Sequence, residues 1–121
     1  PLVTKACDRI KFLGVKPNVA DYLYCAEAFC LSSNFEGLPI SLIEALSAGL
    51  IPICTPVGGI PDVIEDGVIG YLSEDVSLDA YVVALERYLK DGLSSERNIE
   101  YFSANFTMAQ CAKKYFDVYE K

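Results

Sequence analysis

The segment 35–49 constrains the fold of this 121-residue chain more than any other part of it. Pro39 suits the first position of a helix and Gly49 the left-handed position just past its end, so the sequence predicts a helix of about ten residues. Apolar side chains cover almost its whole circumference, and only two serines and Glu44 interrupt them along one narrow stripe. We therefore expect a buried helix in which Glu44 has a polar partner, either in the protein or in a ligand.

Apolar runs of strand length lie on both sides of this helix. Residues 28–32 and 50–55 are almost continuously apolar, which is typical of parallel strands buried on both faces. Strand, helix and strand in this order predict an α/β fold with a parallel sheet. The alternating residues of segment 9–14 predict an edge strand. Further elements are expected as helices within 18–25, 61–65, 78–91, 95–104 and 107–119 and as a short strand at 69–72.

Composition and charge exclude several classes of function. The net charge is −7, and no lysine or arginine lies between Lys16 and Arg87, so nucleic acid is not expected as a partner. The chain has no histidine, which argues against zinc sites and against Ser–His or Cys–His nucleophiles. Its five cysteines include no C-x-x-C pair, so we expect free thiols in a reducing compartment.

Two glutamates flank the start of the predicted helix. On an unbroken helix Glu36 and Glu44 would lie about 80° apart and would not share a face. If Glu36 instead lies in the turn at Gly37, both carboxylates can converge on a ligand over the helix N-terminus. The free amides of Ile40 and Ser41 would then offer a phosphate site. The alternative is a core helix with one paired and one solvated glutamate.

Small residues follow each of the two buried strands. Ser32 and Ser33 end the first, at the edge where parallel sheets bind ligands, but ordinary loop formation is the favoured interpretation. After the second strand, Gly58 and Gly59 would let the backbone approach a ligand closely. A glycine pair that merely turns the chain into the helix at 61–65 is at least as consistent with the sequence.

Two motifs in register carry a family resemblance. The first is E-G-L-P-x-S-L-I-E-A-L-x-A-G, in which seven residues separate Glu36 from Glu44. The second, in segment 55–70, combines a T-x-x-G-G turn with a D-G-x-x-G turn. Together they resemble the donor-binding half of retaining GT-B glycosyltransferases of the GT4 family, also called glycosyl transferases group 1. The resemblance covers residues 9–72 and is looser beyond. We predict one partial domain, residues 1–121, with a nucleotide-sugar-binding core at 9–72 and C-terminal helices at 77–121.

The resemblance implies a function for each part of the motif. The enzyme would move a sugar from a nucleotide diphosphate-sugar, such as a UDP- or GDP-sugar, to an unknown acceptor with retention of configuration. Glu36 is implied to be the catalytic residue that hydrogen-bonds donor-sugar hydroxyls, and Glu44 to hold the ribose. No cofactor and no metal are expected. The remaining donor-binding positions are Gly37, Leu38, Ile40, Ser41, Gly58 and Gly59.

The resemblance also implies an incomplete Rossmann-like, doubly wound parallel sheet. Its strand order would be 3-2-1-4-5-6, with segment 10–14 as the third strand and segment 28–32 as the fourth. The strands between them, and an N-terminal acceptor domain, are expected to be missing, so this chain alone should be inactive. An open edge at 29–31 would recruit another chain. We therefore expect the first strand to shift beside segment 28–32 or to be exchanged within a homo-oligomer.

Two alternatives remain beside a glycosyltransferase. One is a nucleotide-sugar epimerase with the same two-domain architecture, and the other is a non-catalytic α/β interaction module whose glutamates are only structural. Nucleotide-sugar binding would separate the enzymes from the module. A cytoplasmic location is expected, and peripheral attachment of the full-length protein to the inner membrane face stays open.

Overall fold

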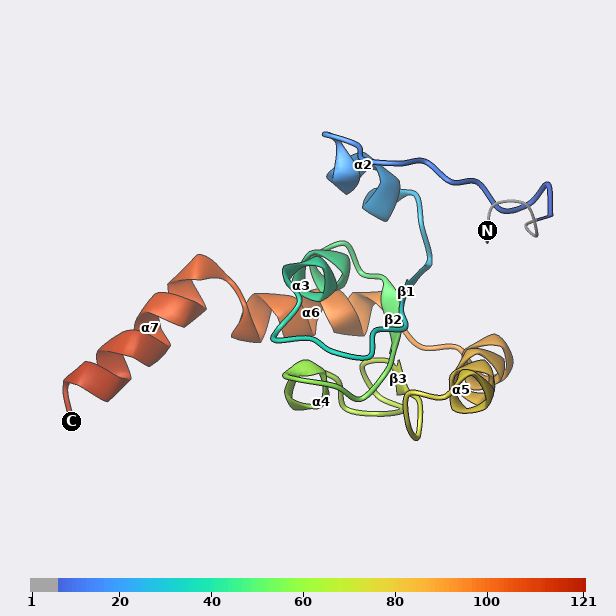
Figure 1. Cartoon of the computed structure of the whole chain (residues 1–121). Helices are drawn as coiled ribbons and strands as arrows, with labels where there is room; N and C mark the ends of the chain where they lie inside the picture. The colour runs from blue at the N-terminus through green and yellow to red at the C-terminus, as the bar shows by residue number, and fades with distance from the viewer. Residues whose placement is uncertain (1–6) are drawn as a thin grey trace.

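The computed structural model describes residues 7–121 of the chain (Figure 1). The helices and strands lie where the sequence predicts them, apart from segment 9–14, with ends that differ by a few residues. In chain order they are α2 (Val19–Tyr24), β1 (Ala28–Leu31), α3 (Ile40–Ser47), β2 (Ile51–Cys54), α4 (Ile60–Val63), β3 (Tyr71–Leu72), α5 (Leu78–Asp91), α6 (Ser95–Asn105) and α7 (Met108–Tyr119).

The three strands form one parallel sheet in the order β1-β2-β3, which confirms the predicted α/β fold. All four residues of the central strand β2 are buried. Pro52 is tolerated there for a geometric reason. The amide of Ile51 bonds to the Glu27 carbonyl, so the nitrogen of Pro52 faces the other side, where β3 begins only opposite Ile53.

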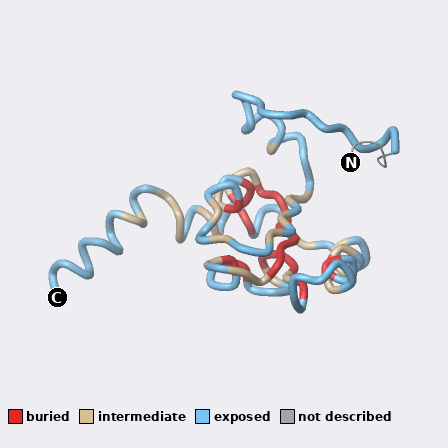
Figure 2. Tube along the Cα trace, in the orientation of Figure 1, coloured by how far each residue is buried: buried red, intermediate tan, exposed pale blue. Residues whose placement is uncertain are grey.

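Two hydrophobic clusters cover the two faces of the sheet, as expected for a doubly wound arrangement. Ile51 and Ile53 of β2 pack with Tyr71, Tyr81 and Ala84 under α5. The other cluster joins α3, β2, α4 and the segment before β3, and side chains of α6 pack against it. Buried residues accordingly concentrate in the middle of the molecule (Figure 2). The division into a core at 9–72 and helices at 77–121 stays a prediction.

The predicted strand at 9–14 is wrong. This segment has no regular structure and is exposed, and Figure 1 shows it running apart from the sheet. The prediction that it would pair beside β1 is therefore wrong as well. An extended segment becomes a stable strand only beside a neighbour that bonds to its backbone, and segment 9–14 has no such neighbour in residues 7–121.

Burial of β1 and α3 is lower than the sequence predicts. Cys30 of β1 is exposed and the other three residues of this strand are only partly buried. In α3 only Leu42, Ala45 and Leu46 are buried, whereas Ile40 is 76% exposed. Burial on both faces of β1, and all round α3, is therefore wrong, because neither element has neighbours on every side within the described residues.

The last helix, α7, projects from the body of the molecule (Figure 1). None of its residues is buried, and its aromatic side chains Tyr115, Phe116 and Tyr119 are exposed, Tyr119 by 83%. These aromatic residues are therefore not part of the core of the described chain. Across residues 7–121, no helix combines the length and the apolar character needed to cross a membrane.

Candidate functional site

The loops after β1 and β2 meet at the carboxyl end of the sheet. The amide of Gly59 donates to the carbonyl of Gly37 over 2.7 Å. Gly58 has φ 57° and lies so close to the Glu36 backbone that a Cβ atom there would overlap the Glu36 carbonyl. Gly58 thus has a packing function that does not involve a ligand, because only glycine allows this approach.

Glu36 is held at its side chain as well as at its backbone. The hydroxyl of Ser33 donates to Oε1 of Glu36 over 2.6 Å, and the hydroxyl of Thr55 donates to the Ser33 carbonyl over 2.5 Å. Thr55 is 1% exposed. Sequence reasoning favoured a loop-forming role for Ser33, although a hydroxyl three residues before the glutamate was a usable signal.

The N-terminus of α3 is open to a ligand. Pro39 is the N-cap residue instead of the first helical residue, and no side chain caps the helix. The amide of Leu42 bonds to the Pro39 carbonyl, so the amides of Ile40 and Ser41 are the free donors. These are the two amides that the sequence predicts for a phosphate, and the helix dipole favours an anion there.

Glu44 lies on an exposed flank of α3, one turn away from this N-terminus. It borders a cavity of about 100 Å³ between α2 and α3, whose wall includes Leu23 and Tyr24. No hydrogen bond to its carboxylate comes from any described residue. The polar partner expected for Glu44 is therefore not supplied by this part of the protein.

The other predicted residues group around Glu36. Gly37 is exposed, and no atom of the described chain lies within 4 Å of a Cβ built at that position. Leu38 is half exposed and would touch a Cβ at Gly59. The structure thus brings Glu36, Gly37, Leu38, Gly58 and Gly59 together beside the free amides of α3. Glu44 faces the neighbouring helix α2 instead.

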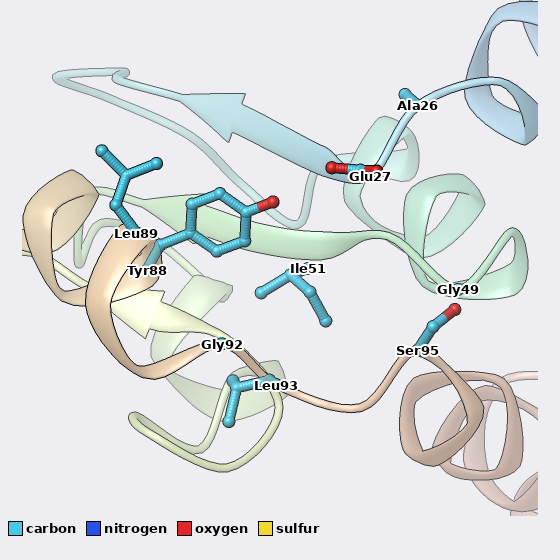
Figure 3. Close-up of a pocket in the computed structure, with 9 residues that line it drawn as sticks. All are labelled: Ala26, Glu27, Gly49, Ile51, Tyr88, Leu89, Gly92, Leu93 and Ser95. Atoms are coloured by element: carbon cyan, nitrogen blue, oxygen red, sulfur yellow. The ribbon is translucent and has the colours of Figure 1, made fainter.

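A second cavity lies at the opposite end of the sheet (Figure 3). It has a volume of about 400 Å³ and is lined by residues that precede β1 and begin β2, together with the end of α5 and Ser95 of α6. None of the predicted site residues lines it. Parallel sheets bind ligands at their carboxyl ends, so this cavity is not the candidate site.

Arg87, which lies near the carboxyl end of the sheet, is already paired. Arg87 of α5 donates to both carboxylate oxygens of Asp66, over 3.0 and 3.1 Å, and its guanidinium lies over the ring of Tyr71. The pairing with Asp66 raises the pKa of Arg87. A phosphate at the N-terminus of α3 would therefore meet backbone amides first.

Comparison with known proteins gives a consistent result. A family model described as "Glycosyl transferases group 1" matches residues 4–104. A glycogen synthase of Thermodesulfovibrio yellowstonii is 28% identical over 113 residues, which are 89% of this chain and 23% of that protein. An N-acetyl-alpha-D-glucosaminyl L-malate synthase of Bacillus anthracis is 45% identical over 67 residues, 55% of this chain and 18% of that protein. The chain thus spans about a fifth of the length of these relatives.

A solved structure shows the same fold. Sucrose-phosphate synthase from Thermosynechococcus elongatus matches with a TM-score of 0.83 at 24% sequence identity. The match covers 98% of this chain and 32% of the other. The match therefore extends over nearly the whole chain, including the projecting helix α7.

Proposed function

The chain belongs to the glycosyl transferases group 1 family, and from this membership we propose that it forms the donor-binding part of a sugar-transferring enzyme. The donor would be a nucleotide diphosphate-sugar, such as a UDP- or GDP-sugar, and transfer would retain the anomeric configuration. The observation that supports this most is the arrangement at the carboxyl end of the sheet. Glu36 lies there beside the uncapped N-terminus of α3.

Each predicted residue has a role in this proposal. Glu36 would accept hydrogen bonds from donor-sugar hydroxyls through the oxygen that Ser33 leaves free. Glu44 would hold the ribose hydroxyls from the flank of α3. The amides of Ile40 and Ser41 would stabilise the charge that develops on the leaving diphosphate, each by roughly 3 kcal/mol. The mechanism proposed here uses no cofactor and no metal.

The remaining donor contacts would come from the loops around Glu36. Gly37 and Leu38 would contact the donor. Gly58 and Gly59 would fix the position of the backbone at Glu36 and Gly37. Exposed Phe35, Leu38 and Ile40 form an apolar rim here. We propose that this rim meets an N-terminal acceptor domain, which would also exclude water from the reacting sugar.

We further propose that Lys or Arg side chains outside this chain pair with the diphosphate. No cation lies between Lys16 and Arg87, and Arg87 is engaged by Asp66. A cytoplasmic location, with peripheral membrane attachment left open, remains part of the proposal. The glycosyl transferase family match favours transfer over an epimerase or a non-catalytic module.

Steady-state kinetics of the full-length enzyme test the two glutamates. Glu44→Gln should mainly raise the KM for the donor, because ribose contacts are equal in ground and transition states. Glu36→Gln should mainly lower kcat, because contacts to the reacting sugar strengthen as its bond breaks. Glu86→Gln, at an exposed position of α5, is the matched control. Near-control values for both variants would make the glutamates structural and refute the proposal.

Calorimetric titration of this chain alone with UDP and GDP tests how much of the site it carries. In this chain a diphosphate would meet backbone amides, without free cations or a closing domain that excludes water. We therefore expect no micromolar binding. Tight binding would show that cations and a second domain are not needed for the anion site.

A further inference from the structure

Two hydroxyl groups connect the central strand to the Glu36 carboxylate. Thr55 follows β2 directly, and its amide bonds to the Leu31 carbonyl at the end of β1 over 3.1 Å. Its hydroxyl bonds to the Ser33 carbonyl over 2.5 Å, and the Ser33 hydroxyl bonds to Glu36 Oε1 over 2.6 Å. Thr55 is buried, so the chain of contacts begins in the rigid core and ends in the loop.

We propose that Ser33 is a positioning residue that sets the direction of the Glu36 carboxylate, and that Thr55 positions Ser33. The inference rests on the proposed role of Glu36 in binding the donor sugar. It adds two residues that touch neither donor nor acceptor and act only through Glu36.

The contacts that hold the loop backbone do not fix the direction of the Glu36 carboxylate, so a side-chain contact is needed for that. The Gly58 and Gly59 contacts hold the main chain at Glu36 and Gly37. The glutamate side chain has three further rotatable bonds, and its only hydrogen-bond partner among the described residues is Ser33. A hydroxyl bound to a carboxylate at this distance is a charge-assisted bond, stronger than one between neutral groups.

The geometry leaves the other carboxylate oxygen available. Ser33 occupies Oε1 only, and an ionised carboxylate has acceptor capacity on both oxygens. Holding one oxygen therefore orients the second toward a ligand without blocking it. A displacement of about 1 Å at a reacting centre can cost roughly 100-fold in rate, so loss of this orientation should appear in kcat.

The test uses the full-length enzyme with Ser33→Ala, Ser33→Thr and the neighbouring Ser32→Ala as matched control, since no hydrogen bond of the Ser32 side chain is found in residues 7–121. Ser33→Ala should lower kcat roughly 10- to 100-fold while the donor KM stays within about threefold. Ser33→Thr keeps the hydroxyl and should restore most of the rate. Thr55→Val should resemble Ser33→Ala, and Thr55→Ser should resemble the wild type.

A double variant separates positioning from general stabilisation of the loop. In a Glu36→Ala background, Ser33→Ala should cost no further activity, because the carboxylate that Ser33 positions is already absent. Full additivity, or a Ser33→Ala rate equal to that of Ser32→Ala, would overturn the inference. If Glu36→Gln alone keeps its activity, the proposed function fails instead. If Ser33→Ala does not fold, Ser33→Cys replaces it. A cysteine keeps the shape of serine but is a weak hydrogen-bond donor, so the same loss of kcat at nearly unchanged donor KM is expected.

Discussion

The outward backbone groups have a hydrogen-bond partner at one edge of the sheet and none among residues 7–121 at the other. At the β3 edge, the outward amide of Leu72 is bound by Oδ1 of Asp66 over 2.9 Å, and Arg87 clamps the same carboxylate. At the β1 edge, Glu27 and Leu31 turn their carbonyls toward β2. Alternate residues face the other way, so Ala28 and Cys30 direct their backbone groups to the empty side. No partner for these groups occurs in residues 7–121.

The difference shows what a short loop can do for an edge strand. The turn that precedes β3 returns an aspartate to the strand within six residues, so the open amide is satisfied locally. The segment before β1 contributes no such acceptor and runs away from the sheet. A residue close in sequence therefore satisfies the open amide of β3. The open backbone groups of β1 need a partner that residues 7–121 do not supply.

The largest expected effect comes from Asn98 of α6, which holds β3 to the rest of the sheet. Its side-chain amide donates to the carbonyls of Leu50 and Ile69 over 2.9 and 2.8 Å. These two hydrogen bonds join the segment before β2 to the segment before β3. Asn98→Ala would orphan two buried carbonyls and leave a cavity, so unfolding should become easier by about 3 kcal/mol. Urea denaturation measures this loss.

Asn105→Ala on the same helix is its control. Within residues 7–121 the Asn105 side chain bonds only to the Tyr101 carbonyl one turn earlier, so its replacement should cost less than about 1 kcal/mol. Equal losses of unfolding free energy for the two variants would show that the Asn98 hydrogen bonds do not hold the segments before β2 and β3 together.

Asp66→Ala should reduce the free energy of unfolding by about 1–2 kcal/mol, because it removes the acceptor for Leu72 and an ion pair that is partly exposed. Asp66→Asn keeps an acceptor oxygen and should lose about half as much. Thermal or urea unfolding compares them. If both variants match Asp62→Ala, an exposed position in α4, the edge does not need its carboxylate.

Self-association should distinguish the open edge from the closed one with little change in stability. We expect the mass measured by light scattering to rise with concentration, as the open β1 edge recruits a second copy. Cys30→Pro should restore the monomer. The Cys30 amide faces away from β2, so proline there should cost the monomer less than about 1 kcal/mol. A wild-type chain that stays monomeric at all concentrations would contradict this prediction.

The last effect has no influence on stability at neutral pH and appears only in alkaline solution. Burial raises the pKa of the Cys54 thiol on β2 from 9.0 to about 12. Between these values the unfolded chain loses a proton that the folded chain keeps, so the free energy of unfolding should fall as the pH rises from 9.0 to about 12. Cys54→Ala should flatten this decline relative to Cys111→Ala, and an unchanged slope would refute the argument. Exposed Cys30 should react with iodoacetamide before buried Cys54.

Local signals predicted most of the secondary structure correctly. Gly49 does take the left-handed conformation after α3, with φ 80°, and Ser77 and Thr107 cap α5 and α7 with their hydroxyls. These signals act within one turn of the chain, so a single sequence shows them. For the candidate site, the motif identified Glu36 and the free amides of α3, while the ligand contacts themselves stay proposals.

The sequence by itself therefore determined the order of strands and helices along the chain, the caps of α5 and α7 and the turn position of Glu36, because each depends on residues a few positions apart. Only the tertiary structure decided which edge of the sheet is closed, that segment 9–14 is not a strand, and that Ser33 and Thr55 hold the carboxylate. Those outcomes depend on whether a backbone or side-chain group finds a partner distant in sequence, such as Thr55 for Ser33, 22 residues away. Periodicity and capping patterns carry no information about such partners, since a strand or loop has the same local sequence with or without its neighbour.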